Sequence, residues 1–272
     1  DNVVKVSEAG KIKVDQVFIG SCTNSSYEDL MKVARILKGH KVHPNVSLVI
    51  GPGSRQVMEM IARNGALADI ISSGARILEN GCGPCIGMGQ APGTNGVSLR
   101  TFNRNFYGRS GTLSAKVYLV SPEVAAASAL TGYLTDPRTL GEMPEITMPE
   151  RFIINDNMIE LPASVEEADS VEIKYGPNIK PFPDSNPVTD TIAANLTLKV
   201  GDNITTDHIM PAGAKILPYR SNIPHLSNYC FGVCDTSFPE IDYSEWREVA
   251  REEFSNGEEY DGAFTFIDLE RK

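Results

Sequence analysis

The sequence lacks any apolar run that approaches the roughly 18–20 consecutive residues needed to span a bilayer, and no signal-peptide pattern opens it. It also lacks an excess of basic residues, since the formal net charge of the 272 residues is −10. This balance argues against a general nucleic-acid or membrane-binding surface, because both need clustered Lys and Arg. Nucleic acid and membranes are therefore not expected as partners.

Cysteine is scarce, and its count of five is odd. Two of the five, Cys82 and Cys85, are only three positions apart in a segment rich in Gly and Pro. This usage indicates a reducing compartment such as the cytoplasm, and a metal or redox role rather than the disulfide frame of a secreted protein. The sequence begins at Asp1 without a Met, so we expect a fragment of a longer chain.

A unit of buried strand, tight turn and amphipathic helix recurs in the first half of the chain. Repeated units of this kind predict parallel strands joined by helical crossovers, and we expect an α/β fold with a three-layer α/β/α domain over residues 1–140. Ligands of such sheets collect beyond the carboxyl ends of the strands, where Cys22 falls. The expected pairs are strand 14–20 with helix 27–38, strand 46–50 with helix 55–64, and strand 117–120 with an Ala-rich helix to Leu130.

The amino-acid composition changes after residue 140. Prolines crowd residues 141–187, which we interpret as a partly structured linker. A second, incomplete domain is predicted over residues 188–272, with its clearest strand at 194–200.

The Cys82–Cys85 pair permits three interpretations: a dithiol redox switch, half of a zinc site, or part of an iron–sulfur site. Thioredoxins share Cys-Gly-Pro-Cys, but there the motif opens a long helix. Here three glycines and a proline follow within eight residues, so no long helix can start. A zinc site would need a fourth ligand from Cys230 or Cys234, for which burial as free thiols is the simpler expectation.

We favour a [4Fe–4S] cluster held by Cys22, Cys82 and Cys85. Electron-transfer clusters use four cysteines, one for each iron. A set of three leaves one iron open, so that it can act as a Lewis acid on substrate oxygens.

Four motifs strengthen this interpretation, because their ordered set resembles the aconitase family. Members of that family interconvert citrate and isocitrate through cis-aconitate at the exposed iron of a [4Fe–4S] cluster, and the resemblance places the three cluster ligands at Cys22, Cys82 and Cys85. It also implies that residues 188–272 are the first part of a β/α swivel-type domain. The motifs are Gly-Ser-Cys-Thr-Asn-Ser at 20–25, Gly-Cys-Gly-Pro-Cys-Ile-Gly at 81–87, Asn-Arg-Asn-Phe-Tyr-Gly-Arg at 103–109 and Thr-Thr-Asp-His-Ile at 205–209.

The loop 102–109 carries Arg104 and Arg109 soon after the paired cysteines. A tricarboxylate substrate needs fixed, permanently charged donors, and Arg grips carboxylates better than Lys. The alternative is an exposed loop whose arginines pair with surface acids. The resemblance favours substrate binding by Arg104, Arg109 and Arg220, with Asn103 close to the cluster.

Asp207 and His208 are adjacent, and neighbouring residues of a strand face opposite ways. They can act together only if the backbone turns after Ile204, and otherwise a turn-capping Asp beside a surface His is the simpler interpretation. The resemblance carries both into the active site as groups that assist proton transfer.

The resemblance also indicates what this chain does not include. Complete aconitases have two further α/β domains and a Ser-Ser-Arg segment that carries the base, so the missing domains of the same enzyme are expected partners and the isolated chain is expected to be nearly inactive. Homoaconitase and isopropylmalate dehydratase share the cluster motifs and are alternative assignments. Another alternative is an RNA-binding relative without its cluster, which the acidic balance disfavours.

Overall fold

The computed structural model describes residues 2–142, 145–172, 198–239, 246–254 and 264–271, together with positions 174, 176, 191 and 196. The chain divides into two compact units, one of residues 1–157 and 212–220, the other of residues 158–211 and 221–272. These units do not coincide with the segments 1–140, 141–187 and 188–272, which remain a prediction as domains. Within the described residues, no helix is both long and apolar enough to cross a bilayer.

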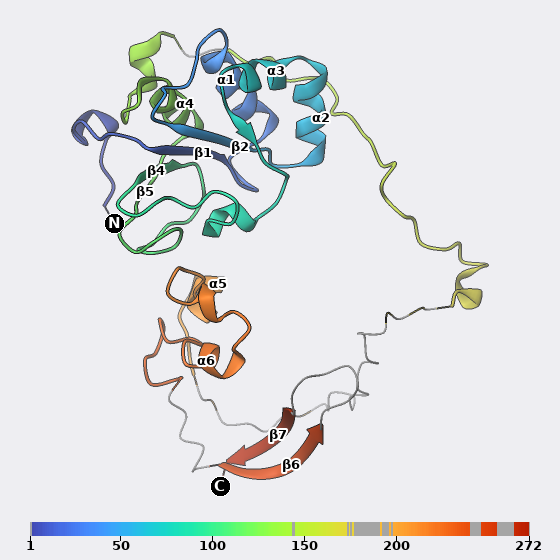
Figure 1. Ribbon diagram of the computed structural model, residues 1–272. Coiled ribbons are helices and arrows are strands. Elements are labelled where there is room, and N and C mark those ends of the chain that lie inside the picture. Colours follow the sequence, from blue (N-terminus) through green and yellow to red (C-terminus); the bar gives the residue numbers. More distant parts are fainter. Residues whose placement is uncertain are drawn as a thin grey trace. The chain divides into compact units, whose positions relative to one another are not determined.

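The first unit is built on a five-stranded parallel sheet with strand order β3-β2-β1-β4-β5 (Figure 1). β1 is central, with β2 and β3 on one side of it and β4 and β5 on the other, so the chain reverses its direction of winding after β3. This confirms the predicted α/β class with a parallel sheet. The strands are β1 (Gln16–Gly20), β2 (Ser47–Gly51), β3 (Arg76–Ile77), β4 (Val97–Arg100) and β5 (Lys116–Leu119).

Alternate residues of β1 supply two different clusters on the two faces of the sheet. Val17 and Ile19 belong to the main hydrophobic core together with residues of the helices. Phe18, between them, belongs to a second, smaller cluster with Phe102 and Cys85. Successive side chains of a strand point to opposite faces, so one strand serves both the core and the loops that carry the cysteines.

The helices of the first unit lie together on one face of the sheet (Figure 1). The face that holds Phe18 is covered instead by loops and by the short 3-10 helix η2 (Gly83–Ile86). Within the described residues, the third layer of the predicted α/β/α arrangement is therefore made of loop rather than α-helix. The helices are α1 (Tyr27–Leu37), α2 (Arg55–Arg63), α3 (Ala66–Ser72) and α4 (Pro122–Thr131).

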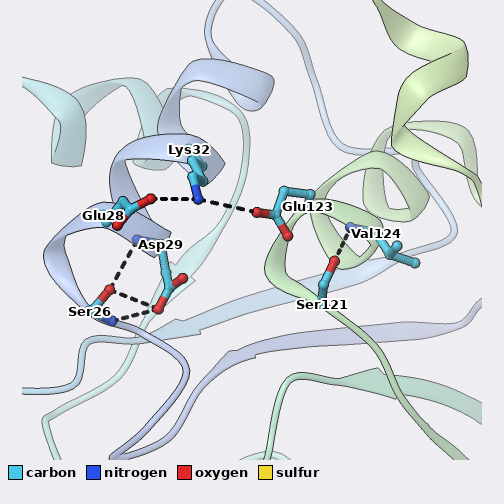
Figure 2. Close-up of polar contacts among 7 residues, drawn as sticks. All are labelled: Ser26, Glu28, Asp29, Lys32, Ser121, Glu123 and Val124. Carbon is cyan, nitrogen blue, oxygen red and sulfur yellow. Dashed lines mark hydrogen bonds and ion pairs between the residues drawn. The ribbon is translucent and has the colours of Figure 1, made fainter. Parts of the chain in front are cut away.

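Side-chain caps fix where α1 and α4 begin (Figure 2). The Ser26 hydroxyl accepts from the Asp29 backbone N–H, while the Asp29 carboxylate accepts from the Ser26 backbone N–H at 3.0 Å. Ser121 caps α4 by accepting from a backbone N–H of its first turn. Lys32 then joins the two helices, with its ammonium 2.7 Å from Glu28 and 3.7 Å from Glu123.

The second unit contains short helices and a two-stranded antiparallel sheet. The strand expected at 194–200 lies partly outside the described residues, and residues 198–200 form no strand. The elements of this unit are η4 (Ala168–Ser170), α5 (Thr206–Ile209), α6 (Ile223–Ser227), β6 (Trp246–Phe254) and β7 (Phe264–Arg271), while η1 (Val6–Glu8), η3 (Pro137–Leu140) and η5 (Leu217–Tyr219) belong to the first unit.

Candidate functional site

Cys22 is exposed in the turn that follows the carboxyl end of β1. Ser21 before it has φ of 105°, an uncommon conformation for a residue with a side chain, so the turn is held by other contacts. Thr101 provides them from beyond β4: its hydroxyl accepts from the Gly20 N–H and donates to the Gly20 carbonyl, both at 2.9 Å. Asn24 donates its side-chain amide to the Thr101 carbonyl. The strand end and the neighbouring strand thus fix the position of Cys22.

Cys82 and Cys85 lie in a Gly-rich loop that crosses from β3 to β4 on the face opposite the helices. The only helical turn is η2, which ends at Gly87 with φ of 94°. This confirms that no long helix follows the motif, which removes the structural basis of the thioredoxin-like interpretation. Cys82 is exposed, whereas Cys85 is 7% exposed and packs in the small cluster with Phe18.

Cys22 and Cys82 both lie near enough to Cys85, in the first unit, to influence its thiol. Burial, the largest cause, and the neighbouring Cys82 and Cys22 thiols together raise the pKa of the Cys85 thiol to about 11, while the Arg109 guanidinium opposes them. The free protein therefore keeps Cys85 as a neutral thiol, and a bound cation is what would favour its thiolate.

These donors fit a multi-iron cluster better than a single ion. Among the described residues, no three or more His, Cys, Asp or Glu side chains are arranged as ligands of one metal ion. A [4Fe–4S] cluster takes each cysteine on a different iron, so its thiols stand further apart than those around one ion. Two exposed thiols near a third that is buried within a Gly-rich loop suit that ligand type.

Of the predicted arginines, Arg109 lies near this loop. Arg109 is 5% exposed, its guanidinium lies 5.3 Å from the centroid of the Phe106 ring, and its charge acts on Cys85. Arg104 is partly buried and Asn103 is exposed. Arg109 is thus a buried arginine near Cys85 rather than a surface arginine, which argues against the alternative of pairing with surface acids for this residue.

Arg220 belongs to the first unit, although it follows most of the second in sequence. Its segment docks on the arginine loop, where the Ala214 N–H donates to the Gly108 carbonyl at 2.6 Å. A Cβ on Gly213 would lie only 3.0 Å from that carbonyl oxygen, so Gly is needed for the approach. The exposed Arg220 ends this segment after η5, in the same unit as Arg104 and Arg109.

Asp207 and His208 lie on α5 of the second unit, both partly buried. The backbone does turn after Ile204, as the sequence required, because a four-residue helix begins there. His208 Nδ1 accepts from the Thr205 N–H at 3.0 Å, so this nitrogen is deprotonated and any proton on the neutral ring is on Nε2. The two residues are described within their own unit, and their role in the site remains a prediction.

Cys230 is partly buried and Cys234 is exposed, so the expectation that both are buried is wrong. The short helix α6 that precedes them has no buried residue, and it offers no core to enclose a thiol. Both are free thiols of the second unit.

Sequence reasoning missed Arg100, which is 1% exposed beneath the cysteine loop. Its guanidinium donates to the Pro84 carbonyl at 3.0 Å, to the Gln16 side-chain carbonyl at 3.1 Å and to the Ser98 hydroxyl at 3.1 Å, and also to the Gln90 carbonyl. Burial lowers the pKa of Arg100 to about 10, so it remains charged at neutral pH. A single Arg in a polar strand gives no sequence signal of such burial.

The first unit is thus a parallel α/β domain that carries Cys22 in the turn after β1 and Cys82 and Cys85 in a Gly-rich loop. Comparison with known proteins agrees: residues 3–132 match the family described as "Aconitase family (aconitate hydratase)". This part of the chain belongs to the aconitase family.

Individual relatives extend the comparison. The chain is 52% identical over 145 residues to "Homoaconitase large subunit" of Thermus thermophilus, which covers 52% of this chain and 34% of that protein. It is 47% identical over 148 residues to "3-isopropylmalate dehydratase large subunit" of Herpetosiphon aurantiacus (53% of this chain, 35% of that protein). It is 37% identical over 248 residues to "Homoaconitase, mitochondrial" of Debaryomyces hansenii (87% of this chain). The chain spans about a third of the length of these relatives, 34% in the last case.

Proposed function

We propose that this chain is part of a cytoplasmic iron–sulfur hydro-lyase that acts on a hydroxy-tricarboxylate of the homocitrate class. The observation that carries the proposal is the convergence of Cys22, Cys82 and Cys85 beside the buried Arg109. The names of the relatives support homoaconitase or isopropylmalate dehydratase chemistry over the citrate–isocitrate reaction that the motifs first suggested.

Each group has a role that follows from its chemistry. Cys22, Cys82 and Cys85 would hold a [4Fe–4S] cluster, which when bound supplies a Lewis-acidic iron for a hydroxyl group. Arg104, Arg109 and Arg220 would bind and orient substrate carboxylates through charge-assisted hydrogen bonds. Asn103 would contribute a neutral donor close to the cluster. Asp207 and His208 would hold or move a proton, with His208 Nε2 as the ring atom left for this by the hydrogen bond at Nδ1.

The position of Arg220 favours a substrate with a third carboxylate. It lies in the same unit as Arg104 and Arg109, which gives three guanidinium groups within one compact body. Isopropylmalate has an apolar group where homocitrate has its third carboxylate arm, so it has less use for the third cation. Further domains or subunits of the enzyme would complete the site, consistent with relatives that are named large subunits.

The cluster is tested by anaerobic reconstitution of the 272-residue chain with iron and sulfide. The expected result is about four iron and four sulfide per chain, with near-complete loss in Cys22→Ser, Cys82→Ser and Cys85→Ser. Cys230→Ser and Cys234→Ser are the matched controls and should bind as the wild type does. Stable zinc without iron, or equal iron in all five variants, would refute the assignment.

The substrate class is tested on the same reconstituted chain by the spectroscopic response of its iron to added ligands. Homocitrate should perturb the spectrum at lower concentration than isopropylmalate or citrate, and Arg220→Met should weaken the response to homocitrate by about tenfold. The same substitution should leave the response to isopropylmalate nearly unchanged. A stronger response to citrate would return the assignment to citrate–isocitrate chemistry.

A further inference from the structure

The cysteine loop is held on the sheet by a small group of polar side chains. Four of its carbonyls, at residues 84, 89, 90 and 91, accept hydrogen bonds from three side chains that rise from the strands. Arg100 binds the first and third, Arg76 binds the second at 2.6 Å, and Gln16 binds the last at 3.0 Å. Of these three side chains, only Arg100 bonds the loop on both sides of Cys85, at Pro84 and at Gln90.

This arrangement follows from the composition of the loop. Gly83, Gly87 and Gly89 have no side chains with which to pack, and Cys85 is the only member of the motif in the buried apolar cluster. A loop of this kind cannot be fixed by hydrophobic contact, so its geometry depends on its backbone hydrogen bonds. The side chains that donate those bonds therefore fix the positions of Cys82 and Cys85.

Arg100 brings a charge as well as donors. It forms no ion pair with a carboxylate in the described part of the chain, and its guanidinium lies 5.7 Å and 5.3 Å from the ring centroids of Phe18 and Phe102. A buried cation without a counter-charge is costly to keep. It is bonded to the carbonyl of Pro84, the residue before Cys85, and it lies by the same two rings that Cys85 packs against, so it is a neighbour of a thiol that becomes an anion when it ligates a metal.

We propose that Arg100 is the positioning residue of the cysteine loop and the counter-charge of the metal-ligating Cys85 thiolate. It holds the loop in shape in the metal-free protein, and it offsets the negative charge that three thiolate ligands bring when a cluster binds. The first role stands on the hydrogen bonds alone, whereas the second rests on the proposed function. Nothing in the aconitase motifs at 81–87 and 103–109 includes this residue.

The positioning role is tested by amide hydrogen exchange in the metal-free chain. The amides of Cys85, Gly87 and Met88 are bonded within the turn and report its order. In Arg100→Met they should exchange about tenfold faster or more, while the Lys38 amide at the end of α1 is unchanged and shows that the fold is intact. Arg63→Met, an exposed arginine of α2, is the matched control and should have no effect. Loop exchange within about twofold of wild type would overturn the role.

Arg100→Lys keeps the positive charge but loses the forked donors, so it tests the two roles separately. It also replaces Arg100→Met as the test variant if Arg100→Met does not fold. A single ammonium cannot replace the forked guanidinium, so the loop amides should again exchange faster than in wild type. After reconstitution, however, iron release to a chelator should be slower from Arg100→Lys than from the uncharged Arg100→Gln, which should release iron about tenfold faster than wild type. Equal release from all three would overturn the counter-charge role. If wild type takes up no iron, the proposed function and the counter-charge role both fail, while hydrogen exchange still decides positioning.

Discussion

At the scale of single residues, the three proposed ligands differ in what protects them. Cys22 and Cys82 are exposed on turns, whereas Cys85 is buried and its pKa is raised. Thiol chemistry depends on the thiolate and on access, and both are unfavourable at Cys85. The metal-free protein should therefore be vulnerable at two of its three ligands and protected at the third.

Alkylation with iodoacetamide should show this order. At pH 8 a thiol with a pKa of about 11 is ionised in only about one molecule in a thousand, so Cys85 should react far more slowly than Cys22 or Cys82. Its rate should rise as the pH approaches 11, because the thiolate fraction then grows. Peptide mapping by mass spectrometry gives each rate, and equal labelling of the three at pH 8 would contradict the burial of Cys85. Cys234, exposed in the second unit, is the internal standard.

At the scale of elements, the caps of the helices make a quantitative prediction. Ser26→Ala removes the oxygen that accepts from the Asp29 N–H and leaves the first turn of α1 uncapped. It should lower the free energy of unfolding by about 1 kcal/mol, measured by urea titration with far-ultraviolet circular dichroism. Ser26→Thr keeps the hydroxyl and should cost clearly less. An unchanged midpoint in Ser26→Ala would show that the cap is not needed.

The glycines of the cysteine loop offer a matched pair of variants. Gly87 has φ of 94°, and a Cβ there would lie 3.2 Å from the Ser110 Cβ, whereas Gly93 has nothing within 4 Å of a built Cβ. Gly87→Ala should strain the turn by about 1–2 kcal/mol and reduce the iron bound after reconstitution, with little change in overall circular dichroism. Gly93→Ala should bind iron as wild type does. The prediction fails if the two variants bind equal iron.

The elements that sequence patterns predicted are those with long, regular apolar periodicity. The strands and helices around Cys22 and after Ser54 and Ser121 were placed to within about two residues, because caps and glycines mark their ends. Helix α3 was missed because it follows Gly65 directly, without a polar cap side chain. Strand β4 was missed because it is short and half polar: Ser98 and Arg100 are buried, but their type predicts exposure.

The sequence motifs also located part of the candidate site. Cys22, Cys82 and Arg109 all lie near enough to Cys85 to affect its pKa, while their roles as ligands and substrate contacts stay predictions. The role of Arg100 could not be predicted, since its burial depends on carbonyls of a loop that lies close only after folding. Side-chain type alone cannot reveal partners supplied by the backbone.

At the scale of the whole molecule, the acidic balance predicts weak affinity for nucleic acid. With a net charge of −10, phosphate groups gain little from long-range attraction. The metal-free chain should retain no RNA hairpin in a filter assay at about 0.1 M salt and micromolar chain, because affinity there depends on neutralising phosphates. A basic RNA-binding protein run in parallel is the positive control. Retention that weakens steeply with salt would instead reveal a local basic surface.

The residues of β1 face the helices and the cysteine loop alternately, and this has a consequence for which substitutions affect the site. Val17 and Ile19 are committed to the helical core, whereas Gln16 faces the loop together with Ser98 and Arg100. A substitution on the loop side changes the support of the cysteines without opening a cavity among the helices. The strand positions that support the cysteine loop can therefore vary separately from those that pack against the helices.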